Sequence, residues 1–161
     1  MSLGNAFINS HFNYAPLIWM FCRKTSYNKI EKIHHKTLNV IYNSDDLYEE
    51  LLLRNNEVSI HQRHLRFLAT EVFKSVNGLN PDFMSDYFTK KSMPYNLRRG
   101  EVLSLPKAKS SYYGIHGFHF RGSILWNNLP SHIKSSRTVN EFKRSLKALG
   151  NIPCLCLICR T

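Results

Sequence analysis

Three cysteines stand within the last eight residues of this 161-residue chain. Cys154, Cys156 and Cys159 form a C-x-C-x-x-C arrangement that follows the helix-stopping residues Gly150 and Pro153. Thiolates are preferred ligands of zinc, and the two-residue gap before Cys159 suits tetrahedral coordination. Three thiolates are one ligand short of a complete set. We therefore expect zinc to bind only where a fourth ligand is supplied.

The spacing of the sequence does not single out that fourth ligand. Four side chains are candidates, none of them at a recognised spacing: Cys22, His116, His119 and His132. The alternative is a tail without metal, in which Leu155, Leu157 and Ile158 cover an apolar patch. The thiols are expected to be reduced, because the N-terminus shows no secretory signal.

Charge is divided unevenly along the chain. Residues 1–86 hold nine Lys or Arg and nine Asp or Glu, whereas residues 87–161 hold thirteen Lys or Arg and only two acids, so the net charge of +11 lies in the second part. Clustered cations gain free energy by displacing counterions from a polyanion. Nucleic acid is therefore the first candidate partner.

Aromatic rings alternate with cations in the same part of the chain. Cations can follow phosphates while exposed rings stack on unpaired bases, which is typical of surfaces that bind single strands or RNA. The residues expected to bind nucleic acid are Lys90, Lys91, Arg98, Arg99, Lys107, Lys109, Tyr112, Tyr113, Phe120, Arg121, Lys143, Arg144 and Lys147. The alternative is that the rings form a core and the cations are only solvated.

Motifs of catalysis are missing from the sequence. It contains no glycine-rich phosphate loop, no nucleophile elbow and no HExxH. Four of the eight histidines fall on helices rich in Lys and Arg, where we expect solvated or phosphate-facing rings: His34, His35, His61 and His64. We interpret Asp45 and Asp46 as helix caps rather than a metal site. The chain is therefore predicted not to be an enzyme.

Helical periodicity and capping signals define the elements. Expected helices span 4–22 with a break at Pro16, 26–41 with Ser26 as cap, 46–53, 59–76, 81–88 and 138–149. Ser59 with Gln62, and Thr138 with Glu141, form capping boxes. Between residues 89 and 122 the period disappears, and only 102–105 resembles a short strand.

These elements predict a mainly α-helical fold. A small helical bundle is followed by an irregular basic segment, a further helix and a tail that contains cysteines. The expected division places a helical domain at 1–88 and a basic tail at 89–161.

Six strings, in order, resemble the C-terminal region of jockey-like non-LTR (LINE-type) retrotransposon reverse transcriptases. They are NSHFNYAPLIWMFC (9–22), KIEKIHHKTLNVIYN (29–43), SIHQRHLRFLATEVFKSVNGLNP (59–81), YNLRRG (95–100), LWNNLP (125–130) and CLCLIC (154–159). The similarity spans almost the whole chain. One departure is Ala15, where family members often carry Cys.

The resemblance implies a thumb-like helical part followed by a basic tail. The paired aspartates of an RNA-directed DNA polymerase would lie upstream, in the palm, and Asp45 with Asp46 does not match them. The implied protein is thus a fragment without polymerase chemistry, whose neutral part supports template and primer. Its basic part would grip element RNA or target DNA.

The expected function is binding of RNA or DNA next to an upstream polymerase palm. Alternatives are a protein-interaction module that docks on an acidic partner, or a nonfunctional retroelement remnant. The longest apolar run, Ala15–Cys22, is too short to span a membrane, so no membrane association is expected. We expect a nuclear or cytoplasmic protein.

Overall fold

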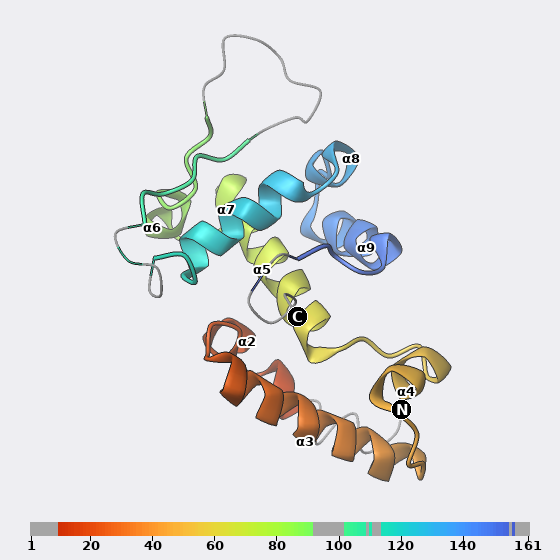
Figure 1. Cartoon of the computed structure of the whole chain (residues 1–161). Helices are drawn as coiled ribbons and strands as arrows, with labels where there is room; N and C mark the ends of the chain where they lie inside the picture. The colour runs from red at the N-terminus through yellow and green to blue at the C-terminus, as the bar shows by residue number, and fades with distance from the viewer. Residues whose placement is uncertain (1–9, 92–101, 109, 111–113, 155, 157–161) are drawn as a thin grey trace. The chain divides into compact units, whose positions relative to one another are not determined.

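The computed structural model describes residues 10–91, 102–108, 110, 114–154 and 156 (Figure 1). Within these residues the fold is mainly helical and contains no strand, which confirms the predicted fold class. Residues 10–13 are helical. The further helices are α2 (Pro16–Trp19), α3 (Lys24–Tyr42), α4 (Tyr48–Arg54), α5 (Ile60–Val76), α6 (Asp82–Ser85), α7 (Phe118–Asn128), α8 (Ser131–Lys134) and α9 (Val139–Leu149).

The two strongest capping signals are confirmed. The Ser59 hydroxyl accepts the Gln62 N–H at 3.3 Å where α5 begins, and the Thr138 hydroxyl accepts the Glu141 N–H at 3.2 Å where α9 begins. Gly78 ends the α5 region with φ +65°, a conformation that glycine adopts without the strain of a side chain.

The predicted caps at Ser26 and at Asp45 and Asp46 are wrong. Helix α3 begins at Lys24, two residues before Ser26, and α4 begins at Tyr48 with Leu47 at its N-cap. Neither N-cap side chain bonds to its helix. The Asp46 carboxylate instead forms an ion pair with Arg54 at 2.6 Å. The side chain that was expected to cap α4 therefore binds another side chain.

The irregular segment is shorter than expected. Helix α7 already begins at Phe118, and α8 follows it; neither was predicted. Gly122 in the middle of α7 weakens the local helical signal. The expected strand at 102–105 contributes only an isolated bridge between Lys90 and Leu103.

Chain contacts divide the protein into two compact units. The first comprises 1–64 with 155–161, and the second comprises 65–154, so the division falls within α5. We describe each unit by itself. The expected boundary after residue 88 lies inside the second unit, and the assignment of a thumb-like domain and a basic tail stays a prediction.

The core of the first unit is rich in imidazole and phenol rings. Tyr27, His34 and Leu38 form the buried face of α3, whereas Ile33 is 57% exposed. Tyr27 meets the rings of His61 and His64 edge-on, at centroid distances of 5.8 and 6.0 Å. The first helical turn of α5 thereby packs against α3.

The core of the second unit is hydrocarbon. Phe73 of α5 stacks on Phe142 of α9 at 4.3 Å, and Trp126 of α7 lies 6.3 Å from Phe142. Figure 1 shows α7 crossing α5. At Gly122 of α7 an added Cβ would stand 2.8 Å from Val72 of α5, so the absent side chain permits the close approach.

Candidate metal centre and nucleic-acid interface

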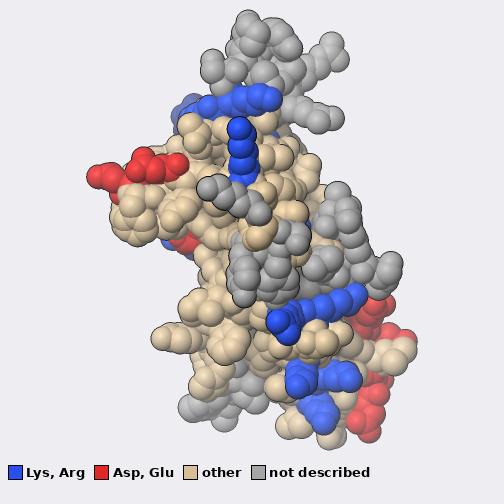
Figure 2. All heavy atoms as spheres, turned by 60° about the vertical axis from the view of Figure 1, so that its left-hand side comes forward, with Lys and Arg blue, Asp and Glu red and all other residues tan. Residues whose placement is uncertain are grey.

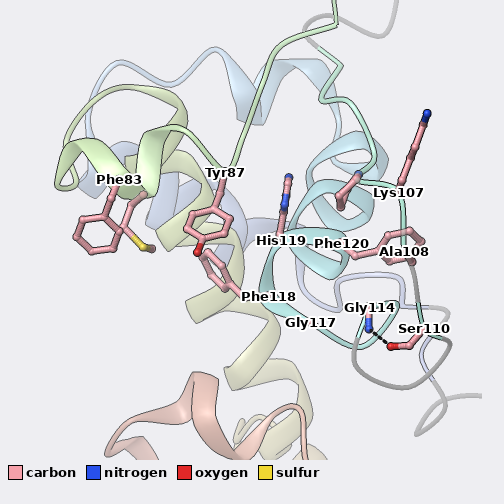
Figure 3. A pocket seen from close by; sticks show the side chains of 12 residues that line it. Phe83, Tyr87, Lys107, Ala108, Ser110, Gly114, Gly117, Phe118, His119 and Phe120 are labelled. Atoms are coloured by element: carbon pink, nitrogen blue, oxygen red, sulfur yellow. Dashed lines mark hydrogen bonds between the residues drawn. The ribbon is translucent and has the colours of Figure 1, made fainter.

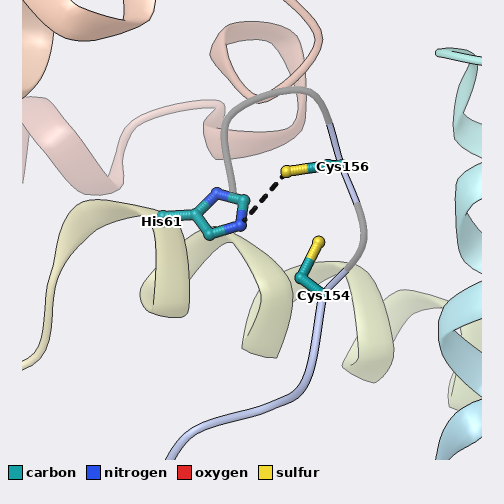
Figure 4. Close-up of side chains that lie close together, drawn as sticks. All are labelled: His61, Cys154 and Cys156. Carbon is teal, nitrogen blue, oxygen red and sulfur yellow. Dashed lines mark hydrogen bonds between the residues drawn. The ribbon is translucent and has the colours of Figure 1, made fainter. Parts of the chain in front are cut away.

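Two cysteines of the C-terminal segment lie beside a histidine of α5. His61 is in the first turn of that helix, and its ligand atom and the sulfurs of Cys154 and Cys156 all lie within 4.8 Å of one another (Figure 4). His61 Nε2 stands 3.5 Å from Cys156 Sγ. The chain therefore holds a group of side chains that could bind a metal ion.

Two of these three side chains are buried, and Cys154 is half-buried. His61 is 6% exposed and Cys156 is 4% exposed, and both belong to the first unit. Cys154 is two residues before Cys156, so the chain itself keeps their sulfurs near each other. Within the second unit, Arg66 donates to the Gly150 carbonyl at 3.0 Å and Ile152 is buried.

The cysteines were predicted as ligands, and His61 was not. It is separated from Cys156 by 95 positions, and no spacing rule connects them. Cys22, His116 and His132 are not part of this group, and neither is His119. Cys159 lies outside the described residues.

Three of the four histidines that were expected to be solvated or phosphate-facing are buried, so that interpretation was wrong for His34, His61 and His64. His34, His61 and His64 are 0%, 6% and 2% exposed. His35 is half-buried, with its Nε2 3.0 Å from the Asp46 carbonyl oxygen. The Lys and Arg residues on the same helices had indicated a solvated face, so the sequence did not predict this burial.

Burial also controls the protonation of two of these rings. It lowers the pKa of His34 to about 4, with smaller contributions from the charges of Arg63 and His35. It lowers the pKa of His64 to about 4 as well, assisted by His61. His34 Nδ1 is 2.9 Å from the Tyr48 hydroxyl. Both rings are therefore neutral at pH 7.

The predicted nucleic-acid residues are distributed over several elements of the second unit. Exposed cations occur near the isolated bridge, before α7 and on α9: Lys90, Lys91, Lys107, Lys143, Arg144 and Lys147. Phe120 and Arg121 are half-buried on α7. The remaining predicted residues lie outside the described part of the chain: Arg98, Arg99, Lys109, Tyr112 and Tyr113.

Helix α9 separates its apolar and basic side chains most clearly. Phe142 and Leu146 are buried, whereas Lys143, Arg144 and Lys147 are exposed. Lys147 follows Lys143 by four positions and Arg144 by three, and residues at these spacings are neighbours on a helix surface. The three cations thus share an outward face, as the sequence predicted.

Ion pairing differs along the chain. Ion pairs within the described part of the chain join Arg54 to Asp46, Arg63 to Glu57 and Lys74 to Glu71. Among the described residues, no carboxylate lies within 4.0 Å of the side-chain nitrogens of six later cations: Lys91, Lys107, Arg137, Lys143, Arg144 and Lys147. On the face drawn in Figure 2, Lys and Arg side chains stand out in separate groups.

An open groove of about 650 Å³ lies within the second unit, between α6, the segment before α7 and the start of α7 (Figure 3). Its lining is mainly apolar and includes Phe83, Tyr87, His119 and Phe120, with Lys107 at the side. Phe83 is 64% exposed. Burial lowers the pKa of His119, which favours its neutral form. The groove therefore offers ring surfaces next to an exposed cation.

None of the helices that the structure describes combines the length and apolar character needed to cross a membrane. Comparison with protein-family models, curated proteins and solved structures finds no match to this chain.

Proposed function

We propose that this chain is a binding module for single-stranded RNA or DNA, acting beside a polymerase palm rather than catalysing a reaction. The observation that carries the proposal is the set of six exposed cations after residue 87 without a carboxylate partner among the described residues. A cation without a carboxylate partner does not have to break an ion pair before it binds phosphate. Counterion release then contributes directly to affinity.

The groove supplies the second part of the interaction. Phe83 and Tyr87 are exposed rings on its α6 side, and Lys107 is an exposed cation on the other. An unpaired base can stack on such a ring while the adjoining phosphate meets the lysine. The resemblance to the end of a non-LTR reverse transcriptase supports the same partner by a separate route.

Salt dependence tests the phosphate contacts. If all six cations reach phosphates, the slope of log affinity against log salt is roughly −4, at about 0.7 per phosphate on a single strand. The triple variant Lys143→Gln, Arg144→Gln, Lys147→Gln should flatten this slope by about 2. An unstructured oligonucleotide and fluorescence anisotropy suffice for the measurement.

A matched control is available on α3. Lys29, Lys32 and Lys36 are exposed on a helix of the first unit, and their triple Gln variant removes the same charge. We expect that variant to leave the slope unchanged. Equal effects of the two triple variants would show that only net charge matters, and the proposed surface would be wrong.

Stacking is tested separately by Phe83→Ala. The exposed ring contributes little to folding, so its removal should weaken binding by about 1 to 3 kcal/mol without changing the salt slope. Tyr14→Ala, at a 75% exposed ring of the first unit, is the control. Equal affinities of the two variants would remove the groove from the interface.

Absence of polymerase chemistry is part of the proposal. We expect no nucleotide incorporation on a primed template with magnesium and triphosphates, because such transfer requires carboxylates that hold two metal ions. Extension by the pure protein above a control without protein would overturn this point.

Zinc is the proposed cofactor of the module. Sulfur and imidazole ligands favour zinc over magnesium or calcium, which prefer oxygen. Metal analysis after purification without added zinc should find about one ion per chain. Absence of zinc, together with failure to take it up, would refute the cofactor.

A further inference from the structure

His61 provides a metal ligand from a part of the chain far from the cysteine motif. We infer that His61 Nε2, Cys154 Sγ and Cys156 Sγ together bind one zinc ion, which fastens the C-terminal segment to the first turn of α5. This inference rests on the proposed zinc cofactor and specifies its ligands. It also departs from a site made of the three C-terminal cysteines alone.

The distances fit tetrahedral zinc with little movement. Bond lengths of about 2.3 Å to sulfur and about 2.0 Å to nitrogen give tetrahedral edges of about 3.5 Å from nitrogen to sulfur and about 3.8 Å between sulfurs. His61 Nε2 and Cys156 Sγ are already 3.5 Å apart. All three atoms lie within 4.8 Å, so closing the site requires shifts on the order of 1 Å.

Charge and burial favour an ion at this position. Two thiolates balance the two charges of a zinc ion, so the occupied site is neutral. This matters because His61 and Cys156 are nearly excluded from solvent, where an uncompensated charge is costly. Tyr27 meets the His61 ring edge-on and helps to hold its orientation.

Three protein ligands leave one tetrahedral position for water or another ligand. Without metal, the same atoms form the 3.5 Å contact between thiol and imidazole. Zinc replaces that weak contact by three coordinate bonds, one to His61 and two to the cysteines, so it joins His61 to Cys156, 95 positions away. Occupancy should therefore raise the midpoint of thermal unfolding.

Cobalt substitution of the full chain tests the ligand set. Co²⁺ adopts zinc geometry, its visible bands report tetrahedral coordination, and its near-ultraviolet charge-transfer band grows with each thiolate. We expect tetrahedral bands with the intensity of two thiolates. Cys154→Ser and Cys156→Ser should each halve the charge-transfer intensity, and both variants and His61→Ala should weaken Zn²⁺ binding at least 10-fold in competition with a chelator.

Controls and a gain-of-signal variant make the test decisive. Cys22→Ser and His132→Ala change a thiol and an imidazole outside the group and should bind cobalt as the unchanged chain does. His61→Cys should keep the metal and add the intensity of a third thiolate. That variant decides the inference even if His61→Ala fails to fold.

The contrary outcomes separate the inference from the zinc cofactor itself. Full binding by His61→Ala, with loss in Cys159→Ser and no added thiolate in His61→Cys, would assign zinc to the cysteines alone and overturn the role of His61. Absence of both cobalt and zinc binding would overturn the cofactor and the ligand set together.

Discussion

The two units are both helical, yet their cores have different chemistry. The first buries His34, His61 and His64 around Tyr27, whereas the second buries Phe73, Trp126 and Phe142. Imidazole gains a charge in acid and binds metals, and hydrocarbon rings do neither. The stability of the first unit should therefore depend on pH more strongly than that of the second, whose buried core rings do not titrate.

The two units also differ in how their surface cations are paired with acids. Arg54 and Arg63 of the first unit pair with nearby acids, whereas the α9 cations of the second have no acid partner among the described residues. The second unit also contains one ion pair, between Lys74 and Glu71, but its α9 cations remain available to a polyanion. This comparison locates the proposed nucleic-acid contacts in the second unit.

The largest effect is expected from Phe142→Ala. The ring is fully buried against Phe73 and Trp126, and such truncations destabilise by about 3 to 5 kcal/mol. In a Trp19→Phe background, Trp126 is the only tryptophan and its fluorescence reports denaturation of the second unit. A loss below about 1 kcal/mol would contradict the stacked core.

Acid should destabilise the first unit. The pKa of His34 is about 4 in the folded protein, against the ordinary value of 6.5. The unfolded chain therefore takes up the proton first as the pH falls from 6.5 to 4, which lowers stability by up to about 3 kcal/mol. Denaturant unfolding at pH 7 and pH 4.5 measures the effect.

His34→Gln removes that titration and should reduce the loss of stability in acid. His132→Gln, at an exposed position, should leave it unchanged. The loss of stability of the second unit between pH 7 and pH 4.5, followed by Trp126 fluorescence, should be smaller. If both units lose equal stability, the proposed contrast between their cores is wrong.

Gly122→Ala tests the packing of α7 on α5. The added Cβ would stand 2.8 Å from a Val72 methyl and 3.0 Å from the Phe88 ring, so we expect a loss of about 1 to 3 kcal/mol. Gly78→Ala meets no atom within 4 Å but has φ +65°, and should cost about 1 kcal/mol. Thermal unfolding of both variants compares crowding with backbone strain.

Thr138→Ala should have the smallest effect, about 1 kcal/mol, because it removes only the cap of α9. Thr138→Ser keeps a hydroxyl and should retain most of the stability. Denaturant titration distinguishes the two variants. Identical losses for alanine and serine would mean that the capping bond contributes nothing.

The sequence predicted helix caps and helix ends correctly where the donor and acceptor of the capping bond lie within one short segment. Ser59 and Thr138 cap helices three residues away, and Gly78 ends one by its own φ. The local sequence signals failed where a distant partner competed. Asp46 pairs with Arg54 instead of capping α4, and α7 depends on the space that Gly122 leaves for Val72.

The sequence by itself determined the helical class, the strongest caps, the excess of cations after residue 87 and the cysteines of the tail. Only the tertiary structure decided which histidines are buried and that His61 meets Cys156. Helix formation and capping depend on residues within about four positions of one another. Burial and metal-ligand geometry depend on packing between segments 95 positions apart, and no local pattern encodes that distance.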